Sequence, residues 1–125
     1  MAETKKILER SEIALKDRWA VEDMYPTDEA WMEDLEKLKT LSAEIAAFSG
    51  KLGQDAKTLL AFAQKTEEAG VLLSNILNYS SRRNDEDTRV AKYQEMNGMA
   101  MSAYVGFASA TAFETPELWQ STRKP

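Results

Sequence analysis

Histidine and cysteine are both absent from the 125 residues of the chain. These residue types supply the usual ligands of protein-bound zinc, so the chain offers no ordinary zinc site. A serine or cysteine nucleophile paired with histidine cannot be built either. General acid–base chemistry would fall to carboxylates, lysine or tyrosine. We therefore expect no catalytic residue, no metal site and no cofactor in this chain, and the sequence assigns no binding residue.

The lack of cysteine also excludes a disulfide framework and is compatible with a reducing compartment. The N-terminus, Met-Ala-Glu-Thr-Lys-Lys, continues into mixed polar sequence without the apolar segment of a signal peptide. These two observations favour a cytoplasmic location.

An uncharged run of 18 residues, Met96 to Phe113, approaches the length of a membrane span. Its serines, glycines and Asn97 do not fit a span, and we expect a central helix buried on most sides.

Basic residues are outnumbered, with 16 Lys and Arg against 21 Asp and Glu and a net charge of −5. A nucleic-acid partner would require a basic stripe that displaces counterions from phosphates. An anionic membrane surface would require a similar excess of positive charge. We expect neither nucleic acid nor membrane as a partner, and the modest acidity fits solubility.

Proline and glycine are scarce, at 3 and 5 residues, whereas alanine, glutamate, lysine and leucine dominate. That mixture favours long helices. Apolar residues at gaps of three and four predict a first helix after Thr27 that ends near Phe48 to Leu52. A second helix is predicted to follow Asp55, to continue through Gly70 and to end at the polar stretch 80–84. The acids Asp85 to Asp87 would begin the third helix.

The predicted fold is all-α: an antiparallel bundle of three long helices with an N-terminal arm and a short C-terminal helix start at Thr115-Pro116. Residues 1–26 would form the arm, because Pro26 interrupts the pattern. Its aromatic residues would pack onto the helices that follow. Residues 27–125 would form the bundle as a single domain.

Small residues recur every four positions in the third helix, at Gly98, Ser102, Gly106 and Ala110. Small residues at this spacing let another backbone approach closely. One interpretation is a docking face for a partner helix. The other is tight packing inside the bundle, and we favour the latter.

Two charged clusters also allow two interpretations. Asp85 to Asp87 suggest a calcium loop, but the mid-loop glycine of such loops is missing, so helix capping explains them better. Arg82 and Arg83 have the chemistry to grip a carboxylate. A solvated helix end is the preferred interpretation.

Several short stretches in order resemble the opening of oligoendopeptidase F, a cytoplasmic zinc metallopeptidase related to thimet oligopeptidase. The resemblance covers about residues 10–118. It rests on the runs 10–13, 18–26 and 28–31, on 48–52, 78–80 and 85–88, and on Tyr93-Gln94, Phe113 and Pro116 to Leu118. The chain departs from the family's Trp-Asp-Leu at Trp19-Ala20-Val21.

The resemblance implies that this chain is the N-terminal helical domain of a longer zinc endopeptidase that cleaves oligopeptides. The family's His-Glu-x-x-His motif binds zinc and supplies the general base, and no position here corresponds to it. The resemblance also implies that the domain forms part of the wall of a substrate channel. Its partners would be the catalytic domain of the same polypeptide and, in the parent enzyme, oligopeptides. The fragment alone should show no activity.

An alternative of a different class is a free-standing helical module that docks a partner helix along residues 98–110. If the chain is a domain of a longer enzyme, we expect some self-association of the fragment, because a domain cut from its context exposes apolar patches.

Overall fold

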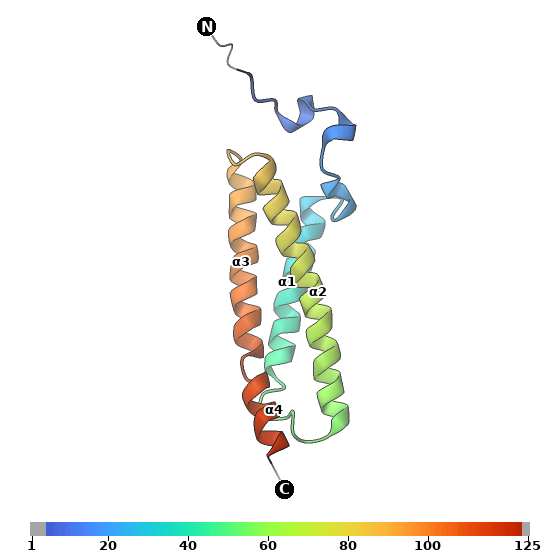
Figure 1. Ribbon diagram of the computed structural model, residues 1–125, viewed down its shortest axis with the longest axis vertical. Helices are drawn as coiled ribbons and strands as arrows, with labels where there is room; N and C mark the ends of the chain where they lie inside the picture. Colours follow the sequence, from blue (N-terminus) through green and yellow to red (C-terminus); the bar gives the residue numbers. More distant parts are fainter. Residues whose placement is uncertain (1–4, 124–125) are drawn as a thin grey trace.

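The computed structural model describes residues 5–123, and within this range it contains helices and turns but no strand. Three long helices, α1 (Asp28–Ala46), α2 (Ala56–Glu86) and α3 (Ala91–Thr111), each pack against the other two. α1 and α3 run in one direction and α2 in the opposite one, and the short α4 (Glu114–Thr122) follows α3 (Figure 1). The expected all-α antiparallel bundle is confirmed.

Thr27 and Asp55, after which the first and second helices were expected, are the N-caps of these helices. The Thr27 hydroxyl accepts a hydrogen bond from the Ala30 backbone N–H at 3.1 Å, and Asp28 and Glu29 occupy the first turn of α1. The Asp55 carboxylate accepts from the Thr58 N–H at 2.7 Å and begins α2. Such caps satisfy N–H groups that have no partner within the helix.

α1 ends at Ala46, earlier than the expected end between Phe48 and Leu52. The chain turns through residues 47–54, where Gly50 has a φ of +83°, a conformation that favours glycine. The backbone N–H groups of Gly50 and Leu52 donate to the Glu117 carboxylate of α4. Leu52 is buried, so this apolar residue joins the core from a turn instead of from a helix.

The boundary between the second and third helices also differs from the prediction. α2 continues through residues 80–86 and α3 begins at Ala91, so the acids 85–87 close α2 and do not open α3. Acids at a helix C-terminus oppose the helix dipole. Arginines offset that cost through the pairs Arg82–Asp85 at 3.6 Å, Arg83–Glu86 at 3.4 Å and Arg89–Asp87 at 2.7 Å.

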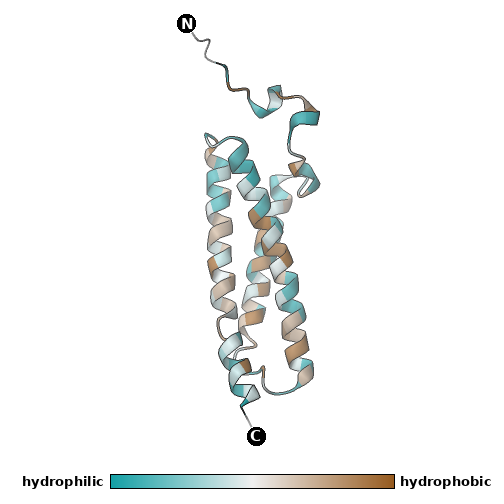
Figure 2. Ribbon diagram, viewed as in Figure 1, coloured by the Kyte–Doolittle hydropathy of each residue, from teal (hydrophilic) through white to brown (hydrophobic). Residues whose placement is uncertain are grey.

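The final helix begins at Glu114, two residues before Pro116, which was expected at the first helical position. Pro116 lies in its first turn, where the missing N–H costs nothing. Figure 2 shows apolar residues recurring along all three long helices. The hydrophobic core consists of Val21, Tyr25, Trp31, Leu35, Leu38, Leu41, Ile45, Leu52, Phe62, Ala69, Leu73, Ile76, Tyr79, Met96 and Ala100.

The N-terminal arm consists of three 3₁₀ turns, η1 (Arg10–Glu12), η2 (Leu15–Asp17) and η3 (Val21–Asp23), and lies beyond the end of the bundle where α2 meets α3 (Figure 1). Its aromatic residues behave differently from one another. Tyr25 is buried and packs edge-on against Tyr79 with ring centroids 5.2 Å apart, as expected. Trp19 is 53% exposed. The ends of the predicted arm and bundle, residues 1–4 and 124–125, lie outside the described residues.

Candidate binding surface

α3 is not buried on most sides, contrary to expectation. Its buried residues are Met96 and Ala100. Met101, Tyr104 and Val105 are 50%, 47% and 60% exposed. The part of the chain that the structure describes contains no helix long and apolar enough to cross a membrane. From Met96 onward, α3 therefore combines an uncharged sequence with a largely exposed surface.

One contiguous side of α3 is exposed over three turns. We call it the open α3 face, and it consists of Gly98, Met101, Ser102, Val105, Gly106 and Ser109. These residues follow the three- and four-residue spacing that places side chains on one side of a helix. None of them carries a charge, so the face differs from an ordinary solvated helix surface.

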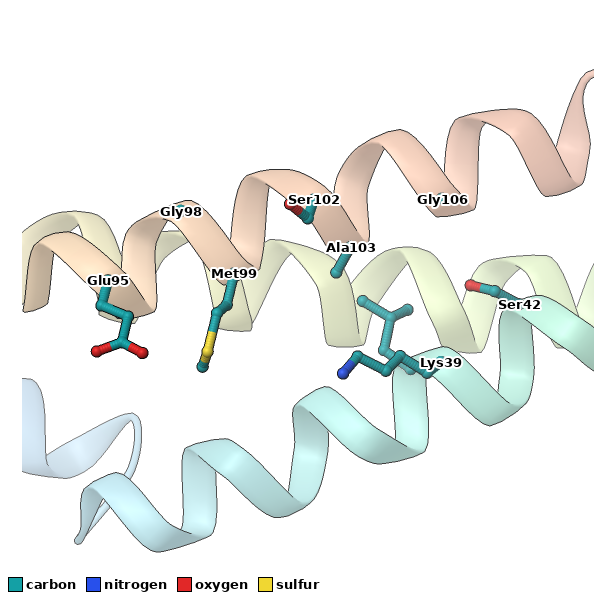
Figure 3. A pocket seen from close by; sticks show the side chains of 9 residues that line it. Lys39, Ser42, Glu95, Gly98, Met99, Ser102, Ala103 and Gly106 are labelled. Atoms are coloured by element: carbon teal, nitrogen blue, oxygen red, sulfur yellow. The ribbon is translucent and has the colours of Figure 1, made fainter. Parts of the chain in front are cut away.

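A groove of about 650 Å³ runs between this face and α1. Figure 3 shows Met99 and Ala103 projecting from α3 toward α1, and Lys39 and Ser42 at the opposite wall. Glu95 lies at one end of the groove. The lining is mainly apolar, and Lys39 and Glu95 add one charge of each sign. The lining residues are Leu38, Lys39, Ser42, Glu95, Gly98, Met99, Ser102, Ala103 and Gly106.

The small residues of α3 are not explained by close packing inside the bundle. A Cβ atom added at Gly98 or at Gly106 would meet no other atom within 4 Å. The favoured interpretation, tight internal packing, is therefore wrong for these two glycines. Their small size instead leaves the groove open and the backbone of α3 accessible, which matches the docking interpretation.

A second cluster of polar residues lies at the arm end of the bundle, centred on Asp28. Its carboxylate accepts hydrogen bonds from the hydroxyls of Tyr79 at 2.7 Å and Tyr93 at 3.3 Å, and it pairs with Lys92 at 2.7 Å. Burial raises the pKa of Asp28, but the bonds from Lys92 and Tyr79 and the nearby positive charges outweigh it, so the pKa is lowered overall. One carboxylate thus joins α1, α2 and α3.

Arg83 belongs to the same cluster, although a solvated helix end was expected for it. Its side chain is 17% exposed, and its guanidinium lies 4.4 Å from the Tyr93 ring centroid and donates to the Tyr93 hydroxyl. It also pairs with Glu86, so it does grip a carboxylate, but one within the chain. Arg82, by contrast, is half exposed and fits the expected solvated end.

The arm is attached to this cluster through Arg10. Its Nε lies 2.6 Å from a Glu86 carboxylate oxygen, and Nη2 donates to the Trp19 carbonyl at 3.1 Å and to Glu22 at 2.7 Å. Burial raises the pKa of Glu86, and the positive charges of Arg10 and Arg83 only partly oppose that effect. We call the set Arg10, Asp28, Tyr79, Arg83, Glu86 and Tyr93 the arm joint.

The chemistry of the arm joint is that of a structural contact. Burial is the largest cause of the raised pKa of Tyr79, and its bond to Asp28 adds to it, so this hydroxyl stays protonated near neutral pH. Glu86 is engaged by two arginines. Among residues 5–123, no three Asp, Glu, His or Cys side chains are grouped so as to hold a metal ion.

Several residues that carry the family resemblance meet near this joint. Tyr25, Asp28, Tyr79 and Tyr93 are linked by ring contacts and hydrogen bonds. Trp31 is fully buried and donates from its indole N–H to the Ile76 carbonyl at 2.9 Å. In the sequence, these residues belong to separate motifs. The structure shows that they are contacts holding three helices and the arm together.

Fold and surface together define a helical bundle domain with one uncharged, exposed helix face. Comparison with known proteins adds the family. The chain is 35% identical over 121 residues to Oligopeptidase PepF of Bacillus subtilis. It is 33% identical over 111 residues to Group B oligopeptidase PepB of Streptococcus agalactiae, and 34% identical over 116 residues to an oligoendopeptidase F homolog of Lactococcus lactis.

These alignments include 89–94% of the chain but only 18–19% of the length of each relative. The chain is thus homologous to proteins of the oligoendopeptidase F family. It corresponds to about one fifth of the length of these relatives, an extent that fits an N-terminal domain. The resemblance seen in the sequence is confirmed. No family model and no solved structure matches the chain.

Proposed function

We propose that this chain is the N-terminal helical domain of a zinc endopeptidase of the oligoendopeptidase F type. The observation that carries the proposal is the homology over nine-tenths of the chain to oligopeptidases about five times as long. The parent enzyme would hydrolyse internal peptide bonds of oligopeptides in the cytoplasm. Zinc and the catalytic residues would come from the rest of the polypeptide.

The domain itself would form part of the wall of the substrate channel. Three rigid helices joined by short turns suit that role, because a wall must keep its shape while peptides pass. It would act by excluding folded proteins and admitting short unfolded peptides. No bond-breaking step would be assigned to its residues.

A peptidase assay tests this proposal. The 125-residue chain, supplied with zinc and an internally quenched oligopeptide, should give no turnover. The full natural polypeptide that contains it should cleave the same peptide, and a zinc chelator should abolish that cleavage. Zinc-dependent cleavage that belongs to the 125-residue chain would refute its role as a non-catalytic wall.

A second candidate function is a free-standing module that docks a helix of an unrelated protein. The open α3 face is the observation that favours it. The natural reading frame separates the two candidates. A stop codon directly after Pro125 supports the module, whereas continuation to a His-Glu-x-x-His motif supports the peptidase domain.

A further inference from the structure

The open α3 face carries no charge although it is exposed. Val105 is 60% exposed, and its neighbours one turn away are Met101, Ser102 and Ser109, all uncharged. Exposed helix surfaces of soluble domains normally carry charged side chains. Another part of the protein would therefore cover this face in the functional state.

α2 supplies an internal comparison. Val71 is also 60% exposed, but Glu67 and Glu68 lie one turn before it on the same side of the helix. That valine is isolated within a charged, solvated surface and needs no explanation. The two valines share residue type and exposure and differ in their surroundings.

The shape of the open α3 face fits a helix. From Gly98 to Ser109 it extends for about 17 Å, at about 1.5 Å per residue, which equals about three helical turns. Glycine and serine along it leave the backbone accessible, so a second helix can approach closely. Leu38 and Met99 give the adjoining groove an apolar floor.

We propose that the open α3 face and the adjoining groove receive an uncharged helix from the remaining part of the same polypeptide. This inference rests on the proposed function. The relatives carry about four-fifths of their length outside the matched segment, so a long stretch of polypeptide is available. A tethered helix has a high effective concentration, which suits a face too small for tight binding between separate molecules.

Thiol labelling tests this proposal, because the chain has no cysteine of its own. Val105→Cys and Val71→Cys are made in the 125-residue chain and in the full natural polypeptide, and each rate of alkylation is followed by peptide mass at micromolar protein. In the 125-residue chain the two thiols should react at similar rates. In the full polypeptide, Val105→Cys should react at least about tenfold more slowly while Val71→Cys is unchanged. Ser109→Cys is the second probe of the face if Val105→Cys impairs folding.

Each other outcome overturns the proposal. Equal labelling of both thiols in a full polypeptide that cleaves oligopeptides rejects the docked helix and leaves the peptidase proposal standing. Protection of Val105→Cys already in the 125-residue chain assigns the face to a second copy instead. A natural polypeptide without zinc-dependent peptidase activity rejects the proposed function, and the docked helix with it.

Discussion

At the residue scale, the Asp28 carboxylate of the arm joint links all three long helices. It caps no helix, but it accepts from two tyrosines on different helices and pairs with Lys92. We expect Asp28→Asn to lower the free energy of unfolding by about 1–3 kcal/mol, because buried partners lose a charged acceptor. Urea unfolding at neutral pH measures the change. Glu33→Gln, at an exposed position of α1, is the control and should have little effect.

The same carboxylate makes a pH-dependent contribution whose sign follows from its lowered pKa. A group with a folded pKa below its unfolded value stabilises the protein above the unfolded pKa of about 4. That stabilisation disappears as the pH falls through the folded pKa. The difference in stability between the native chain and Asp28→Asn should therefore shrink as the pH falls below about 4. An equal difference at pH 7 and at strongly acidic pH would contradict the assignment.

Two tryptophans test how far burial determines the stability of the bundle. Trp31 is fully buried and bonded to the Ile76 carbonyl, whereas Trp119 is 60% exposed. Trp31→Ala should cost about 3–5 kcal/mol, through the cavity and the lost hydrogen bond. Trp119→Ala should cost under about 1 kcal/mol, because exposed substitutions usually change little. Thermal or urea unfolding measures the loss of stability in each variant. Similar losses for the two variants would contradict the difference in burial between Trp31 and Trp119.

At the scale of elements, the sequence predicted the helix starts that depend on contacts between residues close together in the chain. Thr27 and Asp55 are caps that act on N–H groups three residues away, and both were predicted. The end of α2 was missed, because Glu86 is tolerated there through Arg10, which lies 76 residues earlier in the sequence, and through Arg83. Contacts so distant in sequence leave no pattern in a local window.

The surface of α3 also could be predicted only in part from the sequence. A helix was correctly predicted for its uncharged run, because α3 extends from Ala91 to Thr111. The expectation that it is buried on most sides is wrong, because an uncharged composition does not specify which element, if any, covers a helix. No binding residue could be named from the sequence, since the groove depends on how closely α1 approaches α3.

The arm is an element whose attachment depends on few contacts. Arg10→Ala removes its pair with Glu86 and its bonds to Trp19 and Glu22. Tryptic cleavage after Lys16 and Arg18 should become about tenfold faster, as expected for a loss of about 1.4 kcal/mol in local stability. The thermal midpoint of the bundle should move little. Lys6→Ala, which breaks an exposed pair with Glu12, is the control and should leave the cleavage rate unchanged.

At the scale of the whole molecule, a bundle with one uncovered face should associate with itself when it is isolated. The open α3 face measures about 17 Å by 10 Å, far below the roughly 800 Å² per partner of a stable interface, so association should be weak, with a Kd of about 0.1 mM or above. Light scattering and sedimentation over a concentration series measure it. Val105→Lys should shift the chain toward monomer, because a charge on the face resists burial. Val71→Lys, equally exposed on α2, should not. A strict monomer at the highest concentration, or equal effects of both lysines, would remove the open α3 face as the site of contact.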